Sequence, residues 1–272
     1  MMSLFPLPRS IEKKINKARI VFLWQGKKEK KGYNLVKWDT VTLSKQQGGM
    51  GIKKLGAHNE SLLKKWLWRF CREDMALWRS FISQKYGLQT SWVTEEVIGT
   101  FGCSVWKTIR RMWVSFNNNL KYKIGNGEKT SFWNELWIGE EDLKTTFPDL
   151  YILSLQQMDK VAQLWSPQGW NLIFRRALND CEINRVADFL QILNAFPGTT
   201  VGPDLPIWKI HSKGSFMVKP CYWSLNFRQT MTTKWPWELV WKVKIPHKVS
   251  CFIWLATRRA CLTHEVLQRR GI

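Results

Sequence analysis

Four side chains near the C-terminal end of the sequence are of the types that bind metal: His247, Cys251, Cys261 and His264. The first two lie four residues apart, which would place both on one face of a helix. None of the six cysteines belongs to a C-x-x-C pair, which argues against a zinc ribbon and against a disulfide framework. We interpret the cysteines as reduced, small apolar side chains and the histidines as partly exposed, and we expect no metal site.

The acidic residues do not form a catalytic pattern. Polymerase chemistry with two metal ions needs clustered aspartates on adjoining strands, and the sequence has no Asp-Asp pair. Its acidic clusters, at 73–74, 95–96 and 140–142, fall in expected helix starts or exposed turns. No ribonuclease H carboxylate set and no Ser/His/Asp or Cys/His hydrolase pattern is discernible. The glycines at 48–51 lack the spacing of a phosphate-binding loop and are interpreted as a flexible break. We expect no enzymatic activity.

Positive charge is the strongest chemical feature of the sequence. The formal net charge is +21, with +13 in residues 1–72, +2 in 73–139, −4 in 140–204 and +10 in 205–272. Basic side chains release counterions from phosphates, so the charge predicts weak, sequence-independent binding to RNA or DNA. The candidate residues are the basic side chains of the two ends and one tryptophan: Lys13, Lys14, Lys17, Lys64, Lys65, Trp68, Arg69, Arg258, Arg259, Arg269 and Arg270.

Two of these features have alternative interpretations. Trp68 lies on the polar face of its expected helix, where it could stack on a nucleic-acid base or pack under another segment. The lysine run at 27–31 could be a solvated loop or a loop that contacts phosphates.

Hydrophobic periodicity predicts the elements that position these side chains. Helices are expected to begin at Ser10, Asn59, Asp74 and Ser104, and others to cover 172–178, 183–193 and 246–256. The first is basic and carries one apolar stripe, formed by Ile11, Ile15, Ala18 and Phe22. The second carries a core stripe of Leu62, Leu63, Trp66, Leu67 and Phe70, with Lys64, Lys65 and Arg72 on its far face, and the third is expected to end at Gly87. The last is apolar nearly all round, which is typical of an interior helix. Glycine turns predict β-hairpins over 122–133 and 207–219, and the segment 197–206 has the composition of a linker. The expected fold is a mainly α-helical α+β protein with two short β-hairpins and a two-part architecture.

Several motifs carry a family resemblance. The run WPWELVWKVKIPHKVSCFIW at 235–254, followed by LTHEVLQRRG at 262–271, resembles the reverse-transcriptase zinc-binding domain of plant LINE-type (non-LTR) retrotransposons. Further stretches are similar to the same polyproteins: LFPLP at 4–8, FLWQG at 22–26, VKWD at 36–39, GGMGI at 48–52, KWLWRF at 65–70 and KYG at 85–87. The resemblance therefore covers essentially the whole chain, although its middle is less distinctive.

The resemblance implies a division into three parts. Residues 1–90 would be a basic helical region after the polymerase core, 91–196 a middle region, and 205–272 a truncated zinc-binding-like domain. In that family the polymerase core precedes this region and the zinc ligands follow it, so the family's cofactor is zinc but its ligands are missing here.

The resulting hypothesis is a non-catalytic, nucleic-acid-binding piece of such a polyprotein. The alternative is a host-recruited module that binds a protein partner through exposed tryptophans. No signal peptide and no apolar run of membrane-spanning length are evident, so we expect an intracellular protein, in the nucleus or cytoplasm, without membrane contact. The sequence does not indicate the oligomeric state.

Overall fold

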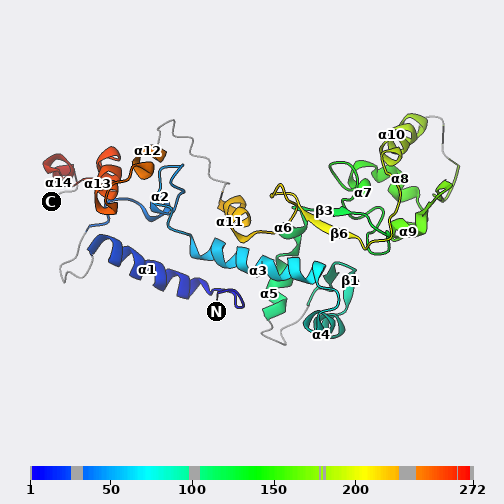
Figure 1. Cartoon of the computed structure of the whole chain (residues 1–272), viewed down its shortest axis with the longest axis horizontal. Helices are drawn as coiled ribbons and strands as arrows, with labels where there is room; N and C mark the ends of the chain where they lie inside the picture. The colour runs from blue at the N-terminus through cyan, green and yellow to red at the C-terminus, as the bar shows by residue number, and fades with distance from the viewer. Residues whose placement is uncertain are drawn as a thin grey trace. The chain divides into compact units, whose positions relative to one another are not determined.

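The computed structural model describes residues 2–25, 33–97, 105–177, 179, 182–226, 237–261 and 263–269. Within these ranges the chain is mainly helical, with three separate two-stranded antiparallel sheets (Figure 1). The predicted mainly helical α+β class is thus confirmed. None of the described helices combines the length and the apolar character needed to cross a membrane.

The chain divides into two compact units. Unit 1 contains residues 1–61 and 222–272, and unit 2 contains residues 62–221. Unit 1 therefore unites the two ends of the chain, which sequence motifs assigned to different parts. The three-part division at 1–90, 91–196 and 205–272 is a division by resemblance and stays a prediction.

Unit 1 is built of helices around a small aromatic core. Its elements are α1 (Arg9–Gln25), α2 (Trp38–Val41), the first residues of α3 (Leu55–Arg72), the last residues of α11 (Val218–Asn226), α12 (Trp237–Lys242), α13 (His247–Thr257) and α14 (His264–Arg269). Val41, Trp237 and Trp254 are buried together at its centre. Helix α3 begins four residues before the predicted start at Asn59, whose side chain instead donates to the Phe5 carbonyl at 2.8 Å.

The turn at Gly48 is a packed part of this core, so the predicted flexible break is wrong. The Gly48 carbonyl accepts a hydrogen bond from Trp254 Nε1 at 2.8 Å and others from the Arg258 guanidinium. Gly48 has φ 82°, and a Cβ there would collide with the Trp237 ring. The glycine is needed because the indoles pack directly on its backbone.

Helix α1 confirms the predicted basic helix, but it packs on a different face. Phe22, in the predicted apolar stripe, is 75% exposed. The packed face contains Glu12, whose Oε1 accepts from the Gly56 N–H at 2.8 Å. It also contains Arg19, whose guanidinium lies 5.3 Å from the centroid of the Trp38 ring. Leu23 and Trp24 pack against the core of unit 1, so the packed face of α1 combines hydrophobic with polar contacts, and the predicted apolar stripe faces outward.

Helix α13 is not the interior helix that its composition predicts. Trp254 is fully buried, but Val249 is 44% and Phe252 62% exposed. Pro246 is the residue before the first turn, close to its predicted place at the helix start. One face of α13 packs on the core of unit 1.

Unit 2 contains most of α3 and shorter elements. Its helices are α4 (Leu77–Tyr86), α5 (Val105–Arg111), α6 (Trp113–Asn117), α7 (Leu143–Thr146), α8 (Pro148–Leu153), α9 (Val161–Leu164), α10 (Ile183–Asn194) and the start of α11. Its strands are β1 (Leu88–Thr90), β2 (Val93–Thr94), β3 (Leu120–Lys123), β4 (Trp165–Ser166), β5 (Gly169–Trp170) and β6 (Leu205–Trp208). Leu63, Leu67 and Phe70 of α3 are buried, as the helical period predicts.

Both predicted hairpins are wrong, although the chain does form two short hairpins elsewhere, β1–β2 and β4–β5. Strand β3 pairs with β6, from Leu120 opposite Trp208 to Lys123 opposite Leu205 (Figure 1). The first strand of the hairpin predicted over 122–133 therefore pairs with the first strand of the hairpin predicted over 207–219. The predicted helix over 172–178 is also replaced, because Phe174 bridges to Ser154 in extended backbone.

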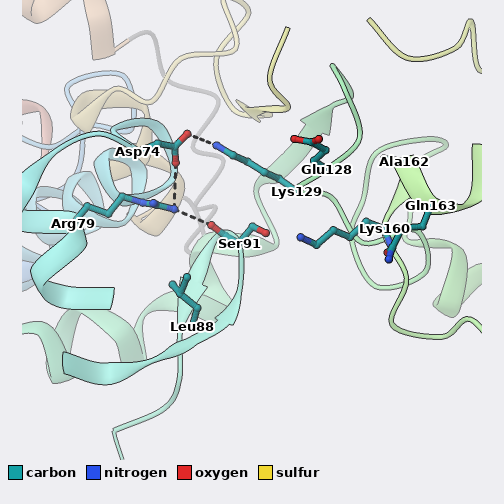
Figure 2. A pocket seen from close by; sticks show the side chains of 9 residues that line it. All are labelled: Asp74, Arg79, Leu88, Ser91, Glu128, Lys129, Lys160, Ala162 and Gln163. Carbon is teal, nitrogen blue, oxygen red and sulfur yellow. Dashed lines mark hydrogen bonds and ion pairs between the residues drawn. The ribbon is translucent and has the colours of Figure 1, made fainter. Parts of the chain in front are cut away.

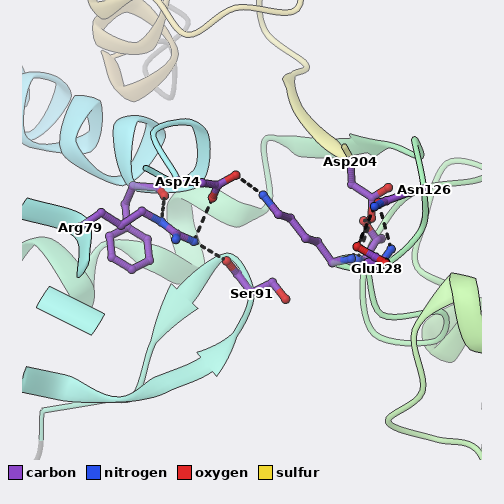
Figure 3. A network of polar contacts seen from close by, with 9 residues as sticks. Asp74, Arg79, Ser91, Asn126, Glu128 and Asp204 are labelled. Atoms are coloured by element: carbon purple, nitrogen blue, oxygen red, sulfur yellow. Dashed lines mark hydrogen bonds and ion pairs between the residues drawn. The ribbon is translucent and has the colours of Figure 1, made fainter. Parts of the chain in front are cut away.

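A buried carboxylate explains why the glycine turn after β3 does not close a hairpin. Asp204, 1% exposed, accepts hydrogen bonds from the backbone N–H groups of Gly125, Gly127, Lys129 and Thr130 at 2.7, 2.8, 3.1 and 3.0 Å (Figure 3). The Thr130 hydroxyl donates a fifth at 2.9 Å. Converging N–H groups stabilise an anion, so the turn folds around this side chain.

The predicted linker at 197–206 is a packed segment that delivers Asp204. The Thr200 N–H donates to the Gly125 carbonyl at 2.6 Å, and Gly198 lies against the Trp165 indole. A Cβ at Gly125 would collide with the Gly202 carbonyl oxygen. Close backbone contact therefore accounts for Gly125, and a φ of 99° accounts for Gly198.

Replacing Asp204 should destabilise unit 2. Asp204→Ala leaves five donors without their acceptor, and we expect a loss of about 3 kcal/mol or more in the free energy of unfolding. Urea unfolding followed by tryptophan fluorescence measures it. Asp188→Ala, at an exposed position, is the matched control and should change stability by less than about 0.5 kcal/mol. Equal effects of the two substitutions would show that the carboxylate is not structural.

Candidate nucleic-acid interface

The lysines of α1 are displayed at the surface. Lys13, Lys14 and Lys17 are all exposed, and they lie on the side of the helix next to its exposed aliphatic residues. The contacts of Glu12 and Arg19 hold the opposite side of α1 against unit 1. The structure therefore places these three predicted residues together, on one helix, with their ammonium groups directed to solvent.

The predicted residues of α3 have different fates. Lys65 is exposed, but Lys64 is only 2% exposed, so its predicted place on the solvent face is wrong. Lys64 lies next to the buried Leu63 on the helix, and the packed face is wider than the stripe of every third and fourth residue. Arg69 forms a bidentate pair with Glu73, at 2.7 and 2.9 Å, and lies over the Trp66 ring. Arg69 is therefore engaged by partners within unit 2.

Trp68 packs under another segment. Its ring lies 6.3 Å from that of Phe216, nearly parallel at 28°, and the Arg72 guanidinium lies over it at 5.8 Å. Of the two interpretations from the sequence, the structure therefore favours packing over base stacking.

The arginines near the C-terminal end are also separated by the structure. Arg258 binds the Gly48 carbonyl and lies over the rings of Trp237 and Trp254, at 4.5 and 5.3 Å. Burial lowers the pKa of its guanidinium. Arg259 is exposed, with a φ of 51° at the helix end. The side chain of Arg269 and all of Arg270 lie outside the described residues, as does the lysine run at 27–31.

The charge is concentrated in one unit. Unit 1 has 22 Lys and Arg residues against 6 Asp and Glu, a formal charge of +16, and unit 2 has 20 against 15, which leaves +5. Unit 1 is also the smaller of the two in residues. The polyanion-binding potential predicted from composition therefore belongs mainly to unit 1.

A cavity of about 740 Å³ in unit 2 contains a network of ion pairs rather than a basic surface. Lys129 reaches across it to Asp74, which also pairs with Arg79 at 3.2 Å (Figure 2). Arg79 further donates to the carbonyl of Ser91 at 3.0 Å. With Glu128 also in the wall, cations and carboxylates alternate. We assign this network to the stability of unit 2.

Glu135 is a buried carboxyl group that the sequence did not reveal. It is 7% exposed and accepts hydrogen bonds from Ser131 N at 2.7 Å and Trp92 Nε1 at 3.1 Å. Burial raises its pKa to about 8, and the Asp204 carboxylate adds to the rise. Among the residues that the structure describes, no group of three or more His, Cys, Asp or Glu side chains that could hold a metal ion surrounds it. The hydrogen bonds from Ser131 and Trp92 make it a structural acceptor.

The comparisons with known proteins agree with the motifs. Residues 216–272 match a family model described as zinc-binding in reverse transcriptase. The whole chain is 26% identical to an Arabidopsis thaliana protein provisionally named a ribonuclease H protein, and spans 44% of it. Over 52% of its length the chain is 29% identical to an uncharacterized mitochondrial protein of Arabidopsis thaliana, covering 91% of that protein. No solved structure matches.

These similarities confirm the resemblance predicted from the sequence: the chain is related to plant retrotransposon reverse transcriptases. The chain spans less than half the length of the relative named for ribonuclease H.

The zinc that the family description implies does not fit the described residues. Cys251 Sγ lies 3.2 Å from His247 Nδ1, but no group of three or more His, Cys, Asp or Glu side chains is placed to hold a metal within the described ranges. A structural site needs four ligands, with cysteines as thiolates. Burial raises the pKa of the Cys251 thiol, which disfavours that form.

The buried Glu135 predicts a pH dependence of stability. Folded unit 2 holds a proton that the unfolded chain releases near the ordinary pKa of 4.5, while the folded pKa is about 8. The folded state binds more protons between these two values, so the free energy of unfolding should fall as the pH rises from 4.5 to about 8, by about 1.4 kcal/mol per pH unit. Glu135→Gln keeps an acceptor oxygen and should flatten the fall, whereas the exposed Glu141→Gln should not. Identical pH profiles for the three proteins, from urea unfolding, would contradict the assignment.

Proposed function

We propose that this chain is a non-catalytic, nucleic-acid-binding region of a plant LINE-type reverse transcriptase, and that unit 1 makes the contact. The observation that carries the proposal is the formal charge of +16 in unit 1 against +5 in unit 2. Lysine and arginine contacts to phosphates are independent of base sequence, so the binding is non-specific and weakens as salt rises. RNA and DNA both present the same phosphate chemistry.

The exposed lysines of α1 form the surface that we assign to phosphate binding. Lys13 and Lys17 are one helical turn apart, and Lys14 extends the same side of the helix. Because α1 is held by contacts on its other side, these ammonium groups project from a fixed support. Lys64, Arg69 and Arg258 are left out, since burial or partners within the chain engage them.

The alternative was a module that binds a protein partner through exposed tryptophans, and the described residues do not support it. None of the tryptophans in the described ranges is exposed. Their indoles fill the two cores, as with Trp254 in unit 1 and Trp133 in unit 2. The nucleic-acid proposal is therefore the one that the described surface supports.

Charge reversal on α1 should weaken nucleic-acid binding. We expect the triple variant Lys13→Glu, Lys14→Glu, Lys17→Glu to lower affinity for a labelled oligonucleotide and to reduce the slope of log K against log salt by roughly 2 to 3. Fluorescence anisotropy at several salt concentrations measures both. An equal charge change in unit 2, at Lys123, Lys209 and Lys213, is the control and should have a much smaller effect. Equal losses would move the contact away from α1.

The purified chain should not extend a primer. Two-metal polymerase chemistry needs clustered aspartates, and the sequence has no Asp-Asp pair. The buried carboxyl groups of unit 2, Asp204 and Glu135, are engaged by hydrogen-bond donors of the chain itself. The measurement is primer extension on RNA and DNA templates with magnesium or manganese. Template-dependent extension by protein free of contaminating polymerase would overturn the non-catalytic assignment.

A further inference from the structure

Unit 1 contains a cavity that is separate from the lysines assigned to phosphate binding on α1. Its volume is about 640 Å³, within the range of roughly 300 to 1,000 Å³ that is usual for small-ligand sites. One wall is Trp24 of α1, and others are Met50, Ile52 and Leu255, so the lining is largely apolar. Polar groups enter from one side, from His247 at the start of α13 and from Cys251.

The cavity has a fixed framework. Trp254 in its wall is fully buried and donates from Nε1 to the Gly48 carbonyl at 2.8 Å. This bond ties α13 to the turn that leads to Met50 and Ile52. A cavity between elements held in this way is a preformed site, which a ligand can enter without rebuilding the unit.

The polar side of the cavity offers two hydrogen-bonding side chains, His247 and Cys251. Cys251 Sγ and His247 Nδ1 lie 3.2 Å apart, and burial raises the pKa of the thiol. An apolar slot with a few polar groups at one edge is the environment that suits a nucleobase, whose faces are apolar and whose edges are polar.

Cations flank this cavity. Lys248 lines it, and Lys45 lies close enough to lower the pKa of the Cys251 thiol in opposition to burial. The Lys45 ammonium lies 4.9 Å from the centroid of the Trp241 ring. Both lysines are exposed, so they can meet phosphates on the backbone of a bound strand.

We propose that this cavity takes one unstacked base of a single-stranded nucleic acid, with the Trp24 ring as its stacking surface and Lys45 and Lys248 on the adjoining phosphates. The inference rests on the proposed function, because it assumes that unit 1 binds nucleic acid, and it adds that single strands are preferred. Bases of an intact duplex are stacked and paired, so they cannot enter such a site without unpairing.

The test compares two single strands of equal length and charge that bind to the unaltered full chain. One is a labelled thymidine 12-mer and the other is the same backbone with abasic sites in place of the bases. Base stacking on aromatic side chains is strong enough that the intact strand should bind about tenfold more tightly at the same salt concentration. A duplex of the same length should bind more weakly than the intact strand.

A variant locates the effect. Met50→Trp places a larger side chain in the cavity and should remove the preference for the intact strand, while binding of the abasic strand stays unchanged. Met217→Trp, at an exposed position of unit 2, is the matched control and should keep the preference. Near-ultraviolet circular dichroism verifies that both variants fold, and the comparison of the two strands on the unaltered chain needs no variant.

The outcomes separate this inference from the proposed function. Salt-dependent binding of both strands with equal affinity overturns the base site and leaves the phosphate contacts standing. A preference that persists in Met50→Trp overturns the location in this cavity. Absence of binding to either strand overturns the proposed function and the base site together.

Discussion

The buried carboxylate of Asp204 is the interaction on which the architecture of unit 2 depends. Burying an ionised side chain costs several kcal/mol unless donors replace its water. Here the turn after β3 supplies those donors, including Gly125 and Thr130, so the turn can adopt its conformation only when the segment before β6 is in place. These hydrogen bonds to Asp204 also align β3 with β6. One charge thus couples two segments separated by about 80 residues, as the spacing of 79 between Asp204 and Gly125 shows.

Unit 1 depends on a different kind of contact, between indoles and backbone. Trp254 donates to the Gly48 carbonyl, and Trp237 packs where a Cβ on Gly48 would lie. The C-terminal helices thereby bury their tryptophans against the N-terminal part of the chain. Motifs at the two ends, which the family resemblance assigned to separate regions, are parts of one core. A matched family segment of 216–272 is consequently not a compact unit by itself in this chain.

The sequence predicted local structure well and non-local structure poorly. The core stripe of α3, the end of α4 at Gly87 and the helix at 183–193 depend on neighbours in sequence, and all are present. The hairpin predictions were wrong because a Gly-Asn-Gly sequence indicates that the chain can turn, but it does not indicate which strand will pair with the strand before the turn. The prediction that Lys64 is exposed was wrong because helical periodicity does not give the width of the packed face. Glu135 had no signal, since a single glutamate beside Trp133 has no pattern that marks burial.

The distribution of acidic residues connects these two architectures to the proposed function. Unit 2 has 15 acidic side chains, and several neutralise its cations or lie in its interior, as Asp74 does for Arg79 and Asp204 for the turn. Unit 1 has 6, and one of them, Glu12, binds the backbone of Gly56 rather than a lysine. Its cations therefore have few partners of opposite charge within the unit. In the proposed complex a polyanion would relieve the repulsion among these cations, so the charge that disfavours compact unit 1 alone would favour the complex that we propose.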